Sequence, residues 1–136
     1  MSAASFALQQ AMFATLSADA GVKSALGDPP RLYDLVPREA VFPYAVLGGD
    51  TETAWNTATD TGSEHALALD VWSRAGGHKE SKQIADALRR ALDDASLSPS
   101  GWSLIAIHYQ GADFGRETDG ETYRATLHFR AVLEVQ

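Results

Sequence analysis

Histidines with a carboxylate nearby are the side chains of this sequence that come closest to an acid–base or metal site. The chain contains four histidines, His65, His78, His108 and His128. None of them stand one helical turn apart, and no His-Glu-x-x-His pattern occurs. His108 and His128 lie on segments predicted to pair as strands, where they would meet with Asp113 nearby. The favoured interpretation is nevertheless that these are ordinary exposed histidines on a sheet face, and we predict no metal site.

Two further motifs resemble catalytic or anion-binding sites but stand in the wrong context. Gly76-Gly77-His78-Lys79 precedes a predicted helix, and helix N-termini bind phosphate. It lacks the spacing of a P-loop or a dinucleotide fingerprint, so a simple strand-to-helix turn is expected. Ser100 and Ser103 flank Gly101-Trp102 without the strand-to-helix elbow that presents a catalytic serine. We therefore predict no enzymatic activity and no cofactor.

The amino-acid composition excludes several kinds of site and of binding partner. The chain has no cysteine, which excludes disulfides, thiolate nucleophiles and cysteine-based metal sites. Eighteen acidic and eleven basic side chains give a net charge of −7, the wrong sign for a protein that grips nucleic acid through its phosphates. The same sign suits a conduit through which DNA slides. The uncharged residues 1–18 are too often interrupted by polar side chains for a membrane span or a signal peptide.

The last segment of the chain predicts one long strand with a buried face and a polar face. From Glu121 to Val135 apolar and polar residues alternate, which places seven side chains on a core face: Tyr123, Ala125, Leu127, Phe129, Ala131, Leu133 and Val135. On the other face Arg124, His128 and Arg130 form a basic stripe, a candidate contact for an acidic partner. The alternative, which we favour, is pairing across the sheet with one of three acids, Glu52, Asp70 or Glu134.

The first helix is predicted over residues 5–16. Its large apolar side chains share one arc, namely Phe6, Leu8, Met12, Phe13 and Leu16. The opposite side carries Ala7, Ala11 and Ala14 rather than charged residues. Two interpretations stay open. Either a second surface, such as a neighbouring subunit, covers this helix, which makes Phe6 and Phe13 interface candidates, or alanine is present for helix propensity.

Further elements are expected in the order helix, strands, helix, hairpin. A short helix over 19–26 is predicted to be capped by Asp19 and ended by Gly27. A brief strand at 32–34 is followed by a longer one over 44–55, in which Gly48-Gly49 indicates a bulge or a close backbone approach. A strand over 65–74, an amphipathic helix over 78–95 and a strand over 102–111 complete the set.

These elements predict an α+β fold, in which an antiparallel sheet of about four strands has helices packed on one face. One domain over residues 1–136 is expected. Residues 56–64 have no large apolar side chain and are predicted to form a mobile hairpin loop. Trp55 and Trp72 near strand ends are expected in the core, and become interface candidates if exposed. The loop adds three further interface candidates, Asn56, Asp60 and Glu64.

Several segments together resemble a known family. They are Leu8-Gln9-Gln10-Ala11 to Leu16, Arg31-Leu32-Tyr33-Asp34, Pro37, Phe42-Pro43-Tyr44, the run from Leu69 to Gly77 that contains Asp70-Val71-Trp72-Ser73, the helix from Lys79 to Leu92, and Tyr123 to Glu134. Their order and spacing resemble the tail completion, or tail terminator, family of long-tailed bacteriophages and related gene transfer agents. The resemblance covers nearly the whole chain.

This resemblance implies a structural virion protein. Members form a hexameric ring on the head-proximal end of the tail tube, stop its polymerisation and supply the surface to which the filled head joins. The implied partners are further copies of the chain, the tail tube protein and a head–tail connector or stopper, with DNA only as passing cargo and no membrane. The implied location is the head-proximal end of the virion tail, and the host cytoplasm during assembly.

Two alternatives stay open. Within the virion, the chain would be a head–tail stopper or the tail tube subunit. From another class, it would be a small enzyme or ligand-binding domain whose site is assembled from His108, Asp113, His128 and Arg130. That alternative requires these side chains to surround a pocket with perturbed ionisation.

Overall fold

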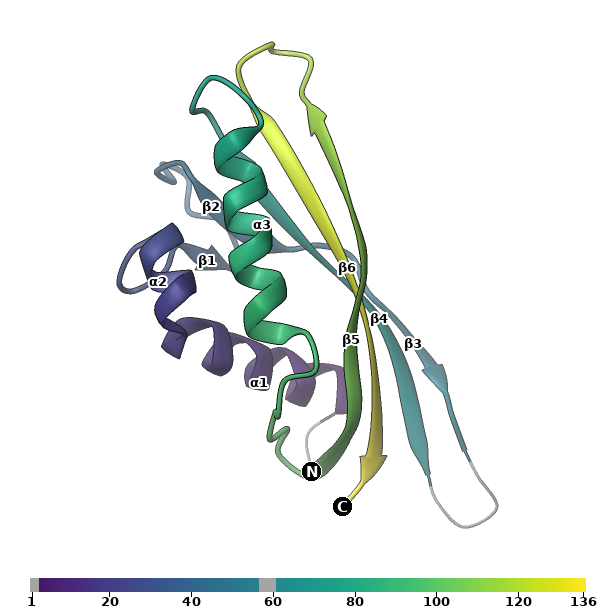
Figure 1. Ribbon diagram of the computed structural model, residues 1–136. Helices are drawn as coiled ribbons and strands as arrows, with labels where there is room; N and C mark the ends of the chain where they lie inside the picture. The colour runs from purple at the N-terminus through teal and green to yellow at the C-terminus, as the bar shows by residue number, and fades with distance from the viewer. Residues whose placement is uncertain (1–2, 57–60) are drawn as a thin grey trace.

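A computed structural model of the chain describes residues 3–56 and 61–136. Within them lie three helices and six strands, an α+β fold as predicted (Figure 1). The elements are α1 (Ala4–Ala18), α2 (Ala20–Leu26), β1 (Leu32–Tyr33), β2 (Tyr44–Leu47), β3 (Thr51–Ala54), β4 (Gly62–Ser73), α3 (Lys79–Leu92), β5 (Trp102–Arg116) and β6 (Tyr123–Val135).

All six strands belong to one sheet, in the order β1-β2-β4-β6-β5, with β3 paired to β4 beyond the end of β2. The expected sheet of about four antiparallel strands is therefore larger and mixed, because β1 pairs with β2 in parallel. The predicted strand over 44–55 divides into β2 and β3 at Gly48-Gly49. A Cβ on Gly48 would lie 3.1 Å from Cβ of Ala68, so the glycine permits the predicted close backbone approach.

Strands β4, β5 and β6 form the long centre of the sheet (Figure 1). β4 begins at Gly62 instead of residue 65, so Glu64 belongs to a strand and not to the predicted loop. Residues 57–60, including the interface candidate Asp60, lie outside the described residues.

β5 continues to Arg116, past the expected end at residue 111. Register shifts before Ala106 and before Gly111 let the strand absorb extra residues and go on pairing with β6.

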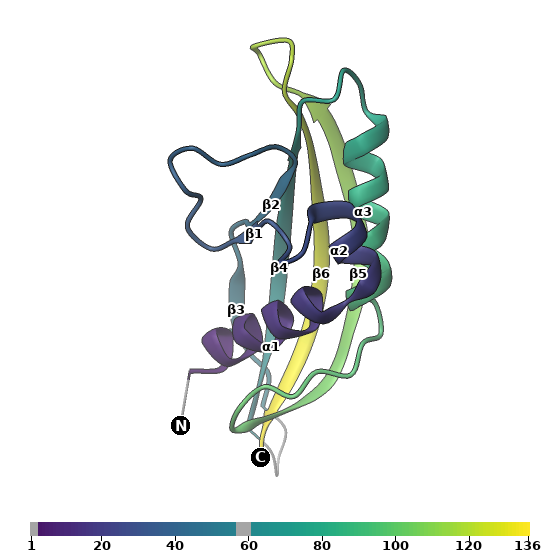
Figure 2. The same ribbon diagram turned by 90° about the vertical axis from the view of Figure 1, so that its left-hand side faces the viewer.

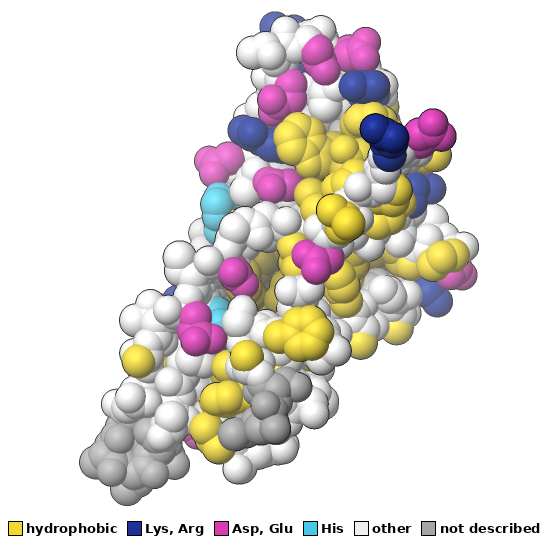
Figure 3. Space-filling model, turned by 180° about the vertical axis from the view of Figure 1, so that it is seen from behind, with side chains coloured by type: hydrophobic (Ala, Val, Ile, Leu, Met, Phe, Trp, Pro, Cys, Tyr) yellow, Lys and Arg dark blue, Asp and Glu magenta, His cyan; other side chains and the backbone are white. Residues whose placement is uncertain are grey.

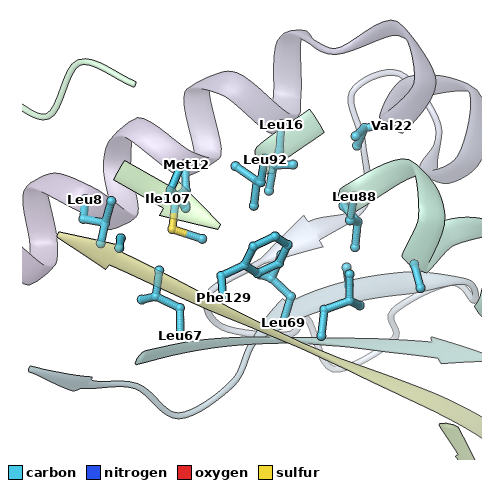
Figure 4. Close-up of a cluster of buried hydrophobic side chains, with 14 of the residues drawn as sticks. Leu8, Met12, Leu16, Val22, Leu67, Leu69, Leu88, Leu92, Ile107 and Phe129 are labelled. Atoms are coloured by element: carbon cyan, nitrogen blue, oxygen red, sulfur yellow. The ribbon is translucent and has the colours of Figure 1, made fainter. Parts of the chain in front are cut away.

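The helices pack on one face of the sheet (Figure 2). Between helices and sheet lies the hydrophobic core, in which Phe129 of β6 occupies the centre of the cluster shown in Figure 4. Five of the seven side chains predicted on the core face of the last strand are buried, namely Ala125, Leu127, Phe129, Ala131 and Leu133. Val135 is 41% exposed, because it is the last residue of the strand.

The buried face of helix α1 is shifted from the one that its large apolar residues predict. Leu8, Met12 and Leu16 are buried as expected, but Ala4 and Ala7 join them. Phe6 is 51% exposed and Phe13 is half-buried. The buried arc is thus rotated towards the alanines, which allow close approach to the sheet.

The other two helices follow the sequence closely. The carboxylate of Asp19 accepts a hydrogen bond from the backbone N–H of Val22 at 3.0 Å and caps α2. Gly27, with φ +95°, follows the last residue of this helix and terminates it as predicted. α3 buries Ile84, Leu88 and Leu92 on one side. It ends at Leu92 instead of residue 95, because Asp93 is already extended. No helix among the described residues is long and apolar enough to cross a membrane.

Candidate interaction surfaces

The sheet face away from the helices is lined by charged pairs. Arg130 of β6 donates two hydrogen bonds to Glu64 of β4, from Nε to Oε1 at 2.8 Å and from Nη2 to Oε2 at 2.9 Å. The hydrogen bond from Arg130 lowers the pKa of Glu64 from its ordinary value. A fork that engages both carboxylate oxygens fixes the orientation of both side chains. These two groups are therefore committed to each other.

The rest of the predicted basic stripe is paired as well. His128 Nε2 lies 3.0 Å from Asp113 Oδ2, and an Arg124 guanidinium nitrogen lies 3.3 Å from Glu117. Arg124 also lies over the ring of the half-buried Trp72, 6.0 Å from its centroid. The favoured interpretation predicted that the basic stripe pairs with acidic side chains, and it does. The acidic residues that it contacts are not the ones that were predicted.

The three acids that were predicted to pair with the basic stripe, Glu52, Asp70 and Glu134, do not do so. Asp70 accepts a hydrogen bond from the Thr126 hydroxyl at 2.6 Å, and Glu52 lies 3.9 Å from His65. Glu134 forms no ion pair with any described residue. β4 supplies Glu64 as the partner of Arg130. The partners of His128 and Arg124 are Asp113 in β5 and Glu117 just after it, because β5 runs beyond its predicted end alongside β6.

A hollow of about 460 Å³ lies on this face, bordered by Asp50, Glu64, His128 and Arg130. Its floor includes Ala66 and Ala68, whose small side chains leave space between the neighbouring strands. Two of the four residues named for the alternative enzymatic or ligand-binding site, His108 and Asp113, do not line it. His108 lies instead beside Asp93 at the end of α3, with Nδ1 3.8 Å from Oδ1.

The structure therefore does not assemble His108, Asp113, His128 and Arg130 around one cavity. No group of three or more His, Asp or Glu side chains in the described part of the chain is close enough to hold a metal ion. Gly76 and Gly77 lie in the turn between β4 and α3, and His78 packs edge-on against the Tyr123 ring at 4.8 Å.

One histidine departs from the expectation of exposed side chains. His65 is fully buried on the core side of β4, where Nε2 shares a hydrogen bond with the Ser63 hydroxyl at 2.8 Å. Its Nδ1 has no hydrogen-bond partner among the described residues, and Glu52 is 3.9 Å away. Burial lowers the pKa of His65, a larger effect than the opposing influence of Glu52 and Asp50. The alternation with Leu67, Leu69 and Val71 was the signal for its burial.

Two of the aromatic interface candidates are accessible to solvent. Phe6 on α1 is 51% exposed, and Trp55, just after β3, is 37% exposed, contrary to the expected core position. The exposed Asn56 accepts a hydrogen bond from the Gly62 backbone N–H at 3.2 Å, which closes the base of the β3–β4 connection. Exposure was the condition under which Trp55 became an interface candidate, and Trp55 meets this condition.

A second accessible apolar surface was missed by sequence reasoning. Residues 34–43, here called the projecting loop, join β1 to β2 and stand away from the body of the molecule (Figure 2). Leu35 is 89% and Val41 is 64% exposed. Seen from behind, hydrophobic side chains gather on the half of the molecule that carries β1 and β2 (Figure 3). A candidate signal in the sequence is that each of these apolar residues stands two positions before a proline, Leu35 before Pro37 and Val41 before Pro43.

The base of the projecting loop is firmly held. Arg31 Nε donates to the Pro43 carbonyl at 2.8 Å, and the Arg74 guanidinium lies 4.3 Å from the centroid of Phe42. Tyr44 packs on Phe42 at 5.0 Å and on Tyr33 at 5.9 Å. These contacts anchor the C-terminal end of the loop to the sheet.

The opposite edge of the sheet carries a further exposed aromatic ring. Phe114 of β5 is 42% exposed, and Lys82 Nζ of α3 lies 5.0 Å above its ring. Ala112, two residues earlier, is half-buried against the core. These three side chains are here called the β5 edge patch. Ile105, at the lower register shift of the same strand, is 49% exposed.

Comparison with known proteins agrees with the resemblance seen in the sequence. Residues 10–134 match the family described as "Tail completion protein gp17". A chain from the virion of a native gene transfer agent particle is similar at 30% sequence identity, with a TM-score of 0.89, over 98% of this chain and 99% of that chain.

The fold recurs at lower identity. The gp17 protein of bacteriophage SPP1 is similar with a TM-score of 0.61 and 20% identity, over 94% of this chain and 89% of that chain. None of the curated proteins matches the sequence.

Proposed function

The chain belongs to the family of tail completion proteins, and from this premise we propose that it forms a ring at the head-proximal end of a tail tube. There it stops polymerisation of the tube and provides the surface to which the filled head joins. Further copies of the chain, the tail tube protein and a head–tail connector are its partners, and a hexamer is the expected ring. The finished ring resides in the virion.

The observation that carries this proposal is the difference between the two edges of the sheet. The projecting loop stands at the β1–β2 edge, and the β5 edge patch lies at the other end of the strand order. A closed ring is a heterologous assembly, in which one patch meets a different patch on the next subunit. Exposed large apolar side chains at both edges are what such a contact requires.

The charge of the chain supports the passage of DNA through this ring. With a net charge of −7, each added copy makes the assembly more acidic. Such a ring repels phosphate, so DNA is not held as it passes. We infer that DNA is cargo for this protein.

Deletion of the gene from the cluster that encodes its parental particle tests the proposal, with the products viewed by electron microscopy. Over-length tubes beside unjoined filled heads are the expected result, and plasmid-borne wild-type protein restores joined particles. Tubes of normal length beside unjoined heads would identify a head–tail stopper instead. Absence of all tubes would identify the tube subunit, and normal joined particles would overturn any role in completion.

A further inference from the structure

The projecting loop and the β5 edge patch have an unusual spatial relationship. Tyr44 of β2 directly follows the loop and pairs with Trp72 of β4. Trp72 pairs in turn with Arg124 of β6. Arg124 pairs with Gly115 of β5, the residue next to Phe114. One transverse row of the sheet therefore has the base of the loop at one end and the edge patch at the other. A neighbouring copy placed along this row brings its own loop to the patch.

The backbone of β5 is accessible next to Phe114. At the middle of the strand, the end of α3 covers the outer edge, because the Asp94 N–H donates to the Ile107 carbonyl and the Tyr109 N–H donates to Asp93. Over residues 110–116 no described residue bonds to the outward-facing groups. A Cβ added at Gly111 or Gly115 would meet nothing within 4 Å. This part of the edge has room for a partner.

We propose that the projecting loop of one copy packs against the β5 edge patch of the next copy, with Leu35 and Val41 covering Phe114. This inference rests on the proposed function, because it names the contact by which the ring closes. The occupant of both surfaces is a second copy of this chain. Burial of three exposed apolar side chains provides the driving force for the contact.

Charge supports the same pairing. Glu39 in the loop and Lys82 in the patch are exposed, and neither forms an ion pair with any described residue. They have opposite signs and stand beside the apolar side chains that the contact would join. Opposite charges at the rim of an apolar contact favour the correct partner and register.

Cross-linking provides a direct test, because the chain contains no native cysteine. We would introduce Val41→Cys together with Phe114→Cys, purify tails from the parental particle and treat them with a short bis-maleimide. Because each subunit then carries both halves of the link, denaturing gels should show a ladder that extends beyond the dimer. Each single-cysteine variant should give no product larger than a dimer.

A matched control uses Val41→Cys together with Val135→Cys. Val135 is 41% exposed, compared with 42% for Phe114, but it ends β6, far along the sheet from the row of Tyr44. This pair should give no ladder. Equal ladders from both pairs, or no ladder from the Phe114 pair in complete tails, would overturn the contact and leave the proposed function standing. Normal joined particles after gene deletion would overturn the proposed function. Cross-linking of the concentrated purified protein would then test whether the contact between copies forms without a tail.

If the cysteine variants fail to enter tails, charge-reversal variants test the same contact. Glu39→Lys and Lys82→Glu should each reduce the number of joined particles, since each places two like charges at the contact. The double variant should restore them, because the opposite signs face each other again. Failure of the double variant to recover would contradict the contact, provided that both single variants fold with the circular dichroism of the wild type.

Discussion

Arg130 and Glu64 are joined across β6 and β4 by two hydrogen bonds, of 2.8 Å and 2.9 Å. The pair spans the two central strands on the face that the helices leave uncovered. Since β4 and β6 are antiparallel neighbours over the whole length of β4, this fork reports directly on their register.

Arg130→Lys should raise the pKa of Glu64 back towards its ordinary value. A lysine keeps the positive charge but cannot make both hydrogen bonds, and the hydrogen bond from Arg130 is the main cause of the low pKa. Carbon-detected NMR titration of the Glu64 carboxyl measures the change. Arg124→Lys is the control, because Arg124 pairs with Glu117 and should leave Glu64 unaltered.

Phe129→Ala should destabilise the fold by about 3–5 kcal/mol, because it empties the centre of the core. Phe129 is 1% exposed and packs edge-on against Tyr109 at 5.7 Å. Urea unfolding followed by tryptophan fluorescence gives the free energy of unfolding. Phe114→Ala removes the same side chain from the sheet edge and should cost clearly less. Equal losses at the two positions would contradict the packing described here.

Stability should fall as the pH decreases below about 6.5, the ordinary value for a histidine, because of His65. Burial lowers its folded pKa, so in this window the unfolded chain binds more protons than the folded one, and acid favours unfolding. The loss stops below the folded pKa, where both states are protonated. Nearby Glu52 and Asp50 oppose the shift without cancelling it. His65→Gln, which keeps a donor for Ser63, should flatten this part of the stability curve measured by urea unfolding.

A second pH effect should appear in strong acid at the β5–β6 hairpin. Hydrogen bonds from the Thr122 hydroxyl and from the backbone of Thr122 and Glu121 lower the pKa of Asp119 to about 2. The folded pKa lies below the unfolded one, so this contribution to stability is complete above pH 3.8 and is lost as the pH falls towards 2. Asp119→Asn should remove the dependence. An NMR titration that finds an ordinary pKa for Asp119 would contradict the turn geometry.

Local patterns in the sequence predicted the elements that are governed by local physics. The alternation of β6, the amphipathic spacing of α3 and the Asp19 cap of α2 all appear in the structure. Each depends on residues near in sequence, whose preferences agree with the fold. The α+β class followed from their order.

Features that depend on distant residues were missed. The parallel pairing of β1 with β2 and the register shifts of β5 are set by neighbouring strands. Phe6 was predicted to share the buried arc of α1, but the sheet accepts the alanine side instead. The resemblance to tail completion proteins was confirmed, whereas the exposure of Leu35, Val41 and Phe114 was not predicted.

The bonds from Asp94 to Ile107 and from Tyr109 to Asp93 have a further consequence. A 15-residue edge strand with all its outward groups free would be a template for endless addition of strands, the step by which fibrils grow. The end of α3 interrupts that template at its middle. The protein thereby leaves only a short part of this edge accessible and avoids the aggregation hazard of a long one.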